Sequence, residues 1–520
     1  MAEVLRPRHP IPHSLSEVAE LVGGHHLGGD ALVTGVSLHT GFTMPGDIFV
    51  ALSGVHRHGA EFWADAKTRG ALALLTDQAG LDVLGEQHPP VILVEHPREV
   101  LGVMSGALYG TSPLEGLRVC AVTGTNGKTS TAYLLDAVMR GLGWTTALST
   151  TAERHVALTA YPSTLTTPEA PEIHAMLGLA KELGAAGVAL EVSAQAIARH
   201  RLDGVVATVA GFTNLSHDHF EDFGNMENYF QAKAQLFTPS LAHQAVVCVD
   251  GVWGQKLAAT APIPVTTVGG VTTQPVDGVP HWSYRVVLEE SAASVFELTG
   301  PSGLSLSLRA PIIGDHMVAN AALAAVMLIQ SGVEASELER HMGPETPGIP
   351  VFLPGRIERV SGVSGPQVFV DAGRSEDAYR ATLATVRART SGRLVMVCGT
   401  SGNRDASKRP LMGAAAAELA DVVIVTDDDP RKEDPAVIRA GLLSGARSVA
   451  NAVVHEIPDP TEAIRFAIGL IDEGDSIVWS GPGSQSYRDI GGEKVPYSAR
   501  DEARRALGEA GWPAPQDSHE

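Results

Sequence analysis

The segment that most constrains this chain is a glycine-rich turn between a short apolar run and a helical pattern. The apolar run covers residues 117–122, the turn reads Thr123-Gly-Thr-Asn-Gly-Lys-Thr129, and a helix is expected over residues 131–142. A strand, a glycine-rich turn and a helix in this order form a loop that binds phosphate groups. The first glycine of the usual G-x-x-x-x-G-K-[ST] pattern is missing, so an ordinary turn is the alternative. We predict a site for ATP or a close relative.

Each residue type in the turn has an expected role. Gly124 and Gly127 let the backbone N–H groups close around a polyphosphate, and Lys128 would neutralise its β- and γ-phosphates. The hydroxyl group of Thr129 would bind Mg²⁺. The predicted nucleotide loop consists of Gly124, Thr125, Asn126, Gly127, Lys128, Thr129 and Ser130.

Length and composition indicate a globular protein of several domains. The chain has 520 residues, of which 44% are hydrophobic and 19% are charged, and this length favours about three domains. Its net charge of −21 argues against a nucleic-acid partner. We see neither a signal peptide nor an apolar run long enough to span a membrane. Cys120, Cys248 and Cys398 lie in apolar runs and are expected to be buried thiols. We expect a cytoplasmic monomer.

Proline- and glycine-rich segments divide the chain into three parts. Residues 109–116 resemble a linker, and residues 343–355 form the clearest boundary. After this boundary, strand-like runs at residues 368–371, 393–398 and 422–426 alternate with helical segments. This alternation is typical of a parallel α/β sheet. We predict an α/β protein with domains at residues 1–112, 113–350 and 351–520.

The central part contains ionisable residues at positions that suit a site beside the loop. Glu191 interrupts an apolar strand, where a lone carboxylate is costly, so we expect a Mg²⁺ ligand or a structural ion pair. His217 and His219 follow a strand expected at residues 205–212, where ligand sites form in open α/β sheets, although solvated histidines are the alternative. Lys233 lies in a largely apolar helix and is either a surface lysine or held in the active site.

In this order and spacing, the loop, Glu191, residues 214–219 and Tyr229-x-x-x-Lys233 resemble the Mur ligases. These ATP-dependent enzymes form amide bonds in peptidoglycan precursor synthesis. Five segments are most similar to the MurE type, which adds the third amino acid to UDP-MurNAc-L-Ala-D-Glu: residues 165–169, 191–195, 355–358, 408–413 and 426–431. The resemblance implies three domains, with a central P-loop ATPase domain and a Rossmann-like C-terminal domain. It also implies a reaction through an acyl phosphate.

The resemblance assigns roles to single residues. The implied catalytic residues are Lys128, Glu191, His219 and Lys233, with Lys233 carbamylated. The implied Mg²⁺ ligands are Thr129, Glu191 and His219. Beyond the loop, ATP would contact Asn320, Arg356 and Asp371. The UDP-MurNAc-dipeptide would contact Thr40, Thr166, Thr167, Ser193 and Arg201. The incoming amino acid would be recognised by Arg404, Asp428, Asp429, Arg431, Gly481 and Gln485.

The sequence departs from the family pattern at several places. The segment Asp371-Ala-Gly-Arg374 lacks the tyrosine and the histidine of the family, and Met317 replaces an asparagine. Residues 39–41 and 482–485 also differ. We interpret the chain as a divergent but active ligase. The alternatives are a non-catalytic protein that binds ATP and a nucleotide sugar, and a folate-polyglutamate-type ligase, against which residues 165–169 and 426–431 argue.

Charges near Arg431 bear on which amino acid is added. The diaminopimelate-adding members of the family have asparagine where this chain has Asp429, and glutamate is usual where it has Gln485. Compared with those residues, Gln485 lacks a negative charge that would face the side-chain amine of the incoming amino acid, and Asp429 supplies one. We therefore expect L-lysine or another diamino acid such as L-ornithine, with meso-diaminopimelate as the alternative.

Overall fold

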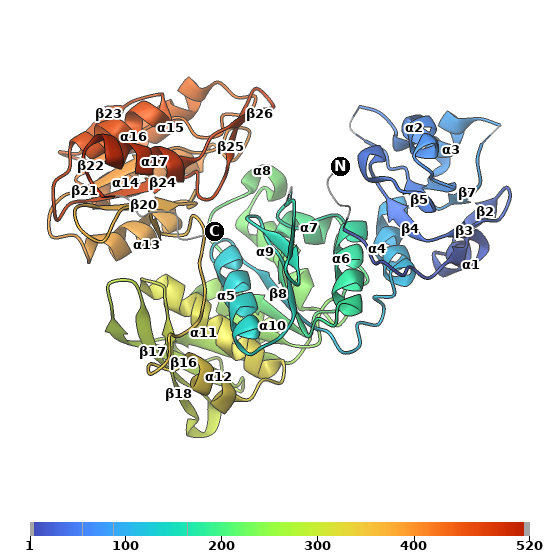
Figure 1. Cartoon of the computed structure of the whole chain (residues 1–520), viewed down its shortest axis with the longest axis horizontal. Helices are drawn as coiled ribbons and strands as arrows, with labels where there is room; N and C mark the ends of the chain where they lie inside the picture. Colours follow the sequence, from blue (N-terminus) through green and yellow to red (C-terminus); the bar gives the residue numbers. More distant parts are fainter. Residues whose placement is uncertain (1–4, 55, 87, 164, 514–520) are drawn as a thin grey trace.

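The computed structural model describes residues 5–54, 56–86, 88–163 and 165–513 and forms three units in chain order (Figure 1). The N-terminal unit, in blue, and the C-terminal unit, in orange and red, lie on opposite sides of the central unit in this view. Each unit has its own main sheet, which confirms the predicted α/β class. We keep residues 1–112, 113–350 and 351–520 as the proposed domains, although residues 1–4 and 514–520 lie outside the described residues.

The N-terminal unit is a five-stranded sheet in the order β2-β7-β6-β5-β4. Its strands are β2 (His25–Leu27), β4 (Gly35–Ser37), β5 (Asp47–Val50), β6 (Ala73–Thr76) and β7 (Val91–Leu93), and β1 (His13–Ser14) pairs with β3 (Leu32–Val33). Its helices are α1 (Leu15–Leu21), α2 (Trp63–Thr68), α3 (Gln78–Leu84) and α4 (Pro97–Leu108), with short turns η1 (Thr40–Phe42) and η2 (Gly59–Phe62). The strands from β4 to β7 are parallel, and α4 packs against α6 (Ala170–Glu182) of the central unit.

The central unit is an eleven-stranded sheet in the order β11-β10-β9-β12-β8-β13-β14-β15-β16-β17-β18. Its strands are β8 (Arg118–Thr123), β9 (Thr146–Ser149), β10 (Arg154–Val156), β11 (Thr159–Tyr161), β12 (Gly187–Glu191), β13 (Val209–Phe212), β14 (Ala245–Cys248), β15 (Val265–Gly270), β16 (His281–Glu289), β17 (Ser294–Thr299) and β18 (Ser305–Ala310). Its helices are α5 (Lys128–Gly141), α6 (Ala170–Glu182), α7 (Ala194–Ala198), α8 (Phe220–Phe223), α9 (Met226–Ala234), α10 (Val252–Thr260), α11 (Asp315–Gln330) and α12 (Ala335–Met342), with η3 (Gln235–Phe237) and η4 (Pro301–Gly303).

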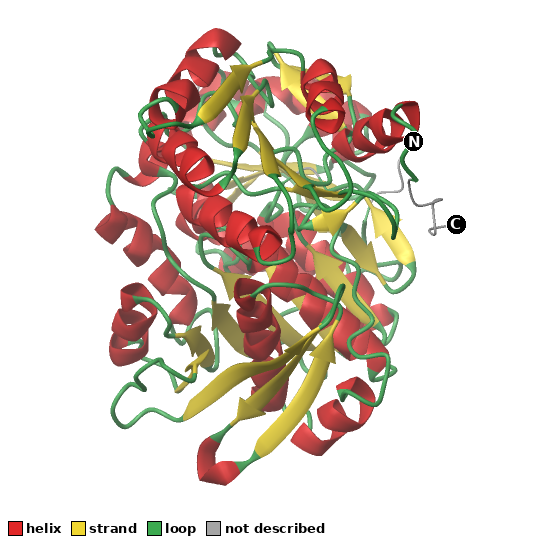
Figure 2. Ribbon diagram, turned by 90° about the vertical axis from the view of Figure 1, so that its left-hand side faces the viewer, coloured by secondary structure: helices red, strands yellow, loops and turns green. Residues whose placement is uncertain are grey.

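Two apolar cores cover the two faces of the central sheet. Successive residues of β8 point to opposite faces, so Cys120 and Val122 join the core formed with α5 and α11, whereas Val119 and Ala121 join the core formed with α6, α9 and α10. Parallel strands that are buried on both faces are expected to be apolar throughout. Figure 2 shows helices on both sides of the strands.

The register of three parallel strands positions the phosphate loop. The strand β8 lies between β12 and β13, with Val122 paired to Glu191 and Thr123 paired to Phe212. The carboxyl ends of all three strands therefore meet at one edge of the sheet. Ligand sites form at such edges in open α/β sheets.

The C-terminal unit is a six-stranded sheet in the order β19-β20-β24-β21-β22-β23, and only β19 is antiparallel to its neighbour. Its strands are β19 (Glu358–Arg359), β20 (Gln367–Asp371), β21 (Leu394–Cys398), β22 (Val422–Val425), β23 (Val453–Glu456) and β24 (Ser476–Ser480), and β25 (Tyr487–Ile490) forms a hairpin with β26 (Glu493–Pro496). Its helices are α13 (Glu376–Arg387), α14 (Lys408–Leu419), α15 (Pro435–Ala446), α16 (Pro460–Gly469) and α17 (Ala499–Glu509). Helices cover both faces of this sheet, as the Rossmann-like prediction requires.

Some sequence-based boundaries differ from the structure. The helix after the phosphate loop covers Lys128–Gly141, so its first turn includes Lys128 and Thr129, and the strand expected over residues 205–212 begins only at Val209. Ala207 forms just an isolated bridge with Ala242. The three cysteines are buried and unpaired, as predicted.

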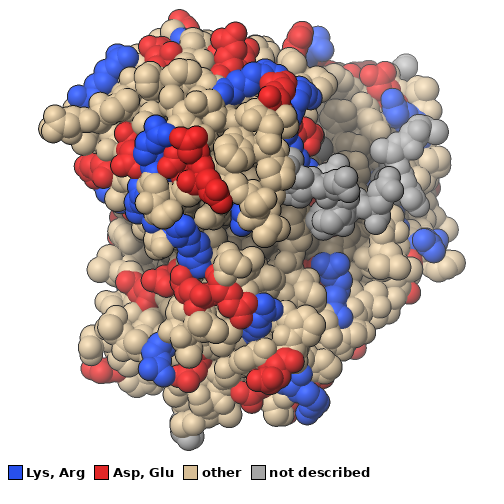
Figure 3. Space-filling model, turned by 60° about the vertical axis from the view of Figure 1, so that its left-hand side comes forward, with Lys and Arg blue, Asp and Glu red and all other residues tan. Residues whose placement is uncertain are grey.

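Figure 3 shows acidic and basic side chains mixed over the visible face, without a broad basic area. Among the described residues, no helix is long and apolar enough to cross a membrane.

Candidate active site

The phosphate loop requires glycine at two positions. Gly124 has a φ of 148° and Gly127 a φ of 86°, and residues with a side chain rarely adopt these angles. A Cβ atom at Gly124 would collide with the hydroxyl group of Thr213, and one at Gly127 would collide with the side-chain amide of Asn320. The loop can therefore keep its shape only without side chains at these positions.

Asn214, just after β13, fixes the loop from the neighbouring strand. The backbone N–H of Thr125 donates to the carbonyl of Asn214 at 2.9 Å, and the backbone N–H of Asn126 donates to its side-chain oxygen at 2.9 Å. The Asn214 amide then donates to the carbonyl of Asn126 at 3.1 Å, and the Thr213 hydroxyl donates there at 2.6 Å. The sequence analysis had included Asn214 only as part of a segment.

Two lysines, the buried Lys233 and the half-buried Lys128, donate to the same backbone carbonyl of the loop. Nζ of Lys233 lies 2.7 Å from the carbonyl oxygen of Gly124, and Nζ of Lys128 lies 3.0 Å from it. Burial lowers the pKa of Lys128. Burial and the nearby charge of Lys128 lower the pKa of Lys233 well below its usual value. Lys233 is therefore not the solvated surface lysine that was the alternative, and loss of its proton is favoured.

Glu191 accepts only neutral donors among the described residues. Its Oε2 accepts from the Thr129 hydroxyl at 3.0 Å and from the N–H and hydroxyl of Thr151 at 2.8 and 3.1 Å. The structural ion pair considered from the sequence is not formed in the described part of the chain. The adjoining oxygens of Thr129 and Glu191 are ligands of the kind that Mg²⁺ prefers.

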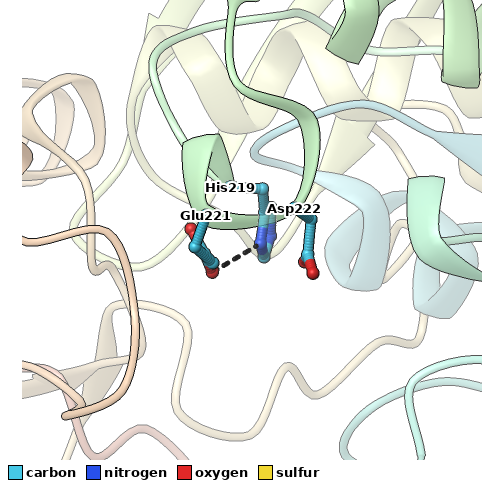
Figure 4. A group of neighbouring side chains, drawn as sticks. All are labelled: His219, Glu221 and Asp222. Atoms are coloured by element: carbon cyan, nitrogen blue, oxygen red, sulfur yellow. Dashed lines mark ion pairs between the residues drawn. The ribbon is translucent and has the colours of Figure 1, made fainter.

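His219 belongs to a small group of ionisable side chains at α8 (Figure 4). Its Nδ1 accepts from the side-chain amide nitrogen of Gln195 at 3.0 Å and lies 3.6 Å from Glu221. Ligand atoms of His219, Glu221 and Asp222 all lie within 4.8 Å of one another. His217, the second histidine of the segment, instead pairs with Asp405 of the C-terminal unit at 2.9 Å.

One cleft of about 740 Å³ joins these groups and lies between the central and C-terminal units. Its size suits a small-molecule site. The predicted residues that line it are Thr125, Asn126, Gly127, Lys128, Thr129, Ser130, Thr166, Thr167, Glu191, Ser193, Arg201, His219, Asn320, Arg356, Asp371 and Arg404. Lys233 lies beneath the loop and not on the cleft wall.

The residues predicted to hold the nucleotide-sugar peptide form a connected group. The hydroxyl of Thr167 donates to the carbonyl of Glu191 at 2.9 Å and accepts from the N–H of Ser193 at 3.0 Å. Arg201 donates to the carbonyl of Thr167 at 3.0 Å. Thr40 lies apart from this group, half-buried in η1 of the N-terminal unit, and its uridine contact stays a prediction.

The C-terminal unit contributes directly to the nucleotide side of the cleft. Arg356 donates to the hydroxyl of Thr129 at 3.1 Å. The carboxylate of Asp371 accepts from the N–H groups of Ile357 and Gly373, at 3.0 and 2.6 Å, so it shapes the backbone beside Arg356. Both residues line the cleft, and their contacts with a nucleotide stay a prediction.

The residues predicted to recognise an amino acid fall into two groups. Arg404 lines the cleft, whereas Asp428, Asp429 and Gln485 contact Arg374. Gly481 donates its N–H to the carbonyl of Asp371 at 2.9 Å. Other cleft residues were not predicted individually, although Asp218 and Arg374 lie in the segments 214–219 and 371–374 described above: Arg199, Asp218, Asp222, Asp250, His316 and Arg374.

Comparison with known proteins gives consistent matches. Residues 122–328 match the family description "Mur ligase middle domain", and residues 355–483 match "Mur ligase, glutamate ligase domain". A protein of Leifsonia xyli subsp. xyli named "UDP-N-acetylmuramyl-tripeptide synthetase" is 45% identical over 511 residues, covering 98% of both chains. A Streptomyces coelicolor protein named "UDP-N-acetylmuramoyl-L-alanyl-D-glutamate--2,6-diaminopimelate ligase" is 36% identical, covering 95% of this chain and 96% of its own.

A solved structure extends the similarity to the whole fold. The structure titled "UDP-N-acetylmuramoyl-L-alanyl-D-glutamate--2, 6-diaminopimelate ligase" aligns with a TM-score of 0.63 and 28% identity. The alignment covers 96% of this chain and 100% of that chain. All three proteins thus match this chain over nearly its full length.

Proposed function

Because this chain belongs to the Mur ligase family, we propose that it adds the third amino acid to UDP-MurNAc-L-Ala-D-Glu with the energy of ATP. The protein is an ATP-dependent ligase of peptidoglycan precursor synthesis. We therefore do not retain the alternative of a non-catalytic protein that binds ATP and a nucleotide sugar. The observation that supports the reaction best is the cleft, where the phosphate loop, Glu191 and the predicted substrate residues Thr167 and Ser193 line one continuous wall.

The first step is transfer of a phosphoryl group. An oxygen of the D-Glu carboxylate attacks the γ-phosphorus of ATP, the bond from that phosphorus to the bridging oxygen breaks, and ADP leaves. The product is an acyl phosphate. Lys128, at the start of α5, would neutralise the phosphate charge, and the N–H groups at the start of this helix point the same way. The contribution of the protein is mainly positioning and charge neutralisation.

The second step forms the amide bond. The neutral amine of the incoming amino acid attacks the acyl carbon, and the tetrahedral intermediate expels inorganic phosphate. The amine nitrogen loses a proton as the amide forms. Water would hydrolyse the acyl phosphate, so closure of the C-terminal unit over the cleft protects it. Contacts such as Arg356 with Thr129 already join the two units.

The donor set at the loop fits Mg²⁺. Thr129 and Glu191 offer adjoining oxygens, 3.0 Å apart, and His219 lies on the same cleft. We propose that these three residues hold the ion, which when bound would neutralise phosphate charge. The hydroxyl group of Thr129 donates to Glu191 and keeps its carboxylate oriented toward the loop.

Lys233 is suited to carbamylation. Its amine is buried and has a pKa well below the usual value because of burial and the charge of Lys128. A neutral amine can attack the carbon of CO₂ and release a proton, which leaves a negatively charged carbamate. We propose this modification because it would replace a second buried cation beside Lys128 by an anion.

We propose that the protein acts in the cytoplasm as a monomer. ATP is a cytoplasmic substrate, and the three unpaired cysteines suit a reducing compartment. The cleft is formed by a single chain, so the reaction requires no second copy.

A direct test uses the purified protein with ATP, Mg²⁺ and UDP-MurNAc-L-Ala-D-Glu, in two arms. In the first, hydroxylamine replaces the amino acid and traps the acyl phosphate as a hydroxamate, detected by mass. In the second, single amino acids are added and the tripeptide product is weighed. We expect a hydroxamate and at least one tripeptide. If no hydroxamate forms although the protein is folded and the substrates are intact, the proposed function is refuted, independently of which amino acid is added.

A further inference from the structure

Arg374 fills an acidic pocket in the C-terminal unit. Its guanidinium lies 2.9 Å from Asp428, 3.3 Å from Asp429, and 2.6 Å from the side-chain oxygen of Gln485, to which it donates. The four residues follow the carboxyl ends of the parallel strands β20, β22 and β24. Three of them, Asp428, Asp429 and Gln485, are those expected to recognise the incoming amino acid.

The two carboxylates have partners within the chain. Both aspartate side chains are only 4% exposed. The second oxygen of Asp429 accepts from the backbone N–H of Asp489 at 3.2 Å. Arg488 donates to the backbone carbonyl of Asp428 at 2.8 Å and adds a second positive charge nearby. The negative charge of this pocket is therefore already balanced.

Arg374 also separates the acidic pair from the cleft. Arg374 and Arg404 line the cleft, whereas Asp428 and Asp429 do not. Arg431 makes no side-chain ion pair or hydrogen bond within the described residues, and it lies close enough to Arg404 and Arg374 for their charges to act on it. A molecule in the cleft therefore meets Arg374 before it meets Asp428 or Asp429.

We propose that Arg374 determines specificity by occupying the position of a side-chain ammonium, so that the acceptor is an L-amino acid whose side chain carries no positive charge. This inference rests on the proposed function and concerns only its second substrate. The sequence-based expectation of a diamino acid had counted the charge of Asp429 as free. In the structure that charge is paired with Arg374.

Displacement of Arg374 by a substrate would gain little. An arriving ammonium would replace charge-assisted contacts that Arg374 already makes, and these are among the stronger contacts in proteins. The displaced guanidinium would move toward Arg404 and Arg431, where like charges repel. An uncharged side chain leaves all these contacts in place.

The first test compares acceptors that have the same number of carbon atoms and differ in charge. L-lysine is matched with L-norleucine, and 2,4-diaminobutyrate with homoserine, and kcat/KM of the wild-type protein is measured for each. We expect the uncharged acceptor of each pair to be preferred at least about tenfold. Preference for the ammonium acceptor in both pairs would overturn the inference.

The second test alters Arg374. Arg374→Met leaves the acidic pair without its counter-charge, so the ratio of kcat/KM for the ammonium acceptor to that for its uncharged partner should rise about tenfold or more. Arg374→Lys keeps the charge and should keep the wild-type ratio. Arg380→Met is the matched control, because Arg380 lies on α13 and pairs with Glu376 and Glu418 at the surface. An unchanged ratio in folded Arg374→Met would contradict the role.

The hydroxylamine arm keeps the two proposals apart. A hydroxamate together with tripeptides only from ammonium acceptors would reject the role of Arg374 and keep the ligase. The absence of a hydroxamate would reject the ligase itself. If Arg374→Met does not fold, the wild-type acceptor pairs still decide the question.

Discussion

At the scale of single residues, one backbone carbonyl binds two lysines, Lys128 and Lys233, to which we assign different roles. Both ammonium groups donate to the carbonyl of Gly124, so two positive charges are held close together in a buried place. The pKa of each lysine falls because of burial, and that of Lys233 falls furthest in the presence of Lys128. Lys128 then suits phosphate binding, and the lowered pKa of Lys233 suits covalent modification of its amine.

Lys128→Ala should abolish turnover, because Lys128 is the only lysine or arginine within the phosphate loop itself. We expect kcat to fall by far more than about tenfold, which corresponds to about 1.4 kcal/mol. Lys256→Ala is the control, since Lys256 pairs with Glu227 at the surface. A Lys128→Ala protein that retains more than about a tenth of the wild-type kcat would refute the assigned role.

Lys233→Ala should be folded and nearly inactive, because the variant can form no carbamate. Added bicarbonate should not restore activity, whereas a short carboxylate such as formate should restore part of it by entering the vacated space. The modification itself is tested by ¹³C NMR of wild-type protein equilibrated with ¹³CO₂. A fully active protein without a carbamate signal would refute the proposal.

At the scale of elements, a buried histidine joins α5 to β10. The ring of His155 lies 3.2 Å from Asp136 and 3.1 Å from Glu153, and Tyr133 donates to Glu153 at 2.9 Å. Burial alone would lower the pKa of His155, but its two carboxylate partners outweigh burial and raise it to about 9. The charged ring therefore holds the helix of the phosphate loop against the neighbouring hairpin.

This pKa predicts how stability depends on pH. A histidine whose pKa is higher in the folded than in the unfolded chain contributes stability that is fully present below about pH 6.5. The contribution, at most about 3 kcal/mol, is lost as pH rises toward the folded pKa of about 9. His155→Gln should therefore lower Tm clearly at pH 6 and only slightly at pH 10. An equal decrease at both values would show that the charge of His155 is unimportant.

The elements also show what sequence patterns can and cannot predict. The phosphate loop was predictable because its residues are contiguous and Gly124 and Gly127 have a specific backbone role. The parallel strands of the C-terminal unit were predictable from local apolar runs. The pairing of Arg374 with Asp429 was not, because it depends on β24 and β21 lying between β20 and β22. No local pattern encodes that strand order.

At the scale of the whole molecule, ionic contacts hold the C-terminal unit against the central unit. Lys408 donates to Asp218 at 2.7 Å, and His217 pairs with Asp405 at 2.9 Å. Burial alone would raise the pKa of Asp218, but the charges of Lys408 and His219 and the hydrogen bonds to the carboxylate together outweigh burial and lower that pKa. The contacts bring Arg356 to the phosphate loop, so the arrangement of the two units decides whether the nucleotide site is complete.

Lys408→Met should loosen this arrangement, because it leaves Asp218 charged without its nearest cation. Small-angle X-ray scattering of the ligand-free variant should show a larger radius of gyration than that of the wild type, and KM for ATP should rise. ATP with UDP-MurNAc-L-Ala-D-Glu should restore the compact form, since substrates that contact both units favour closure by their differential affinity. Arg387→Met is the control, because Arg387 pairs with Asp421 inside the C-terminal unit. Identical scattering of Lys408→Met and wild type, with unchanged KM for ATP, would mean that packing alone holds the units together.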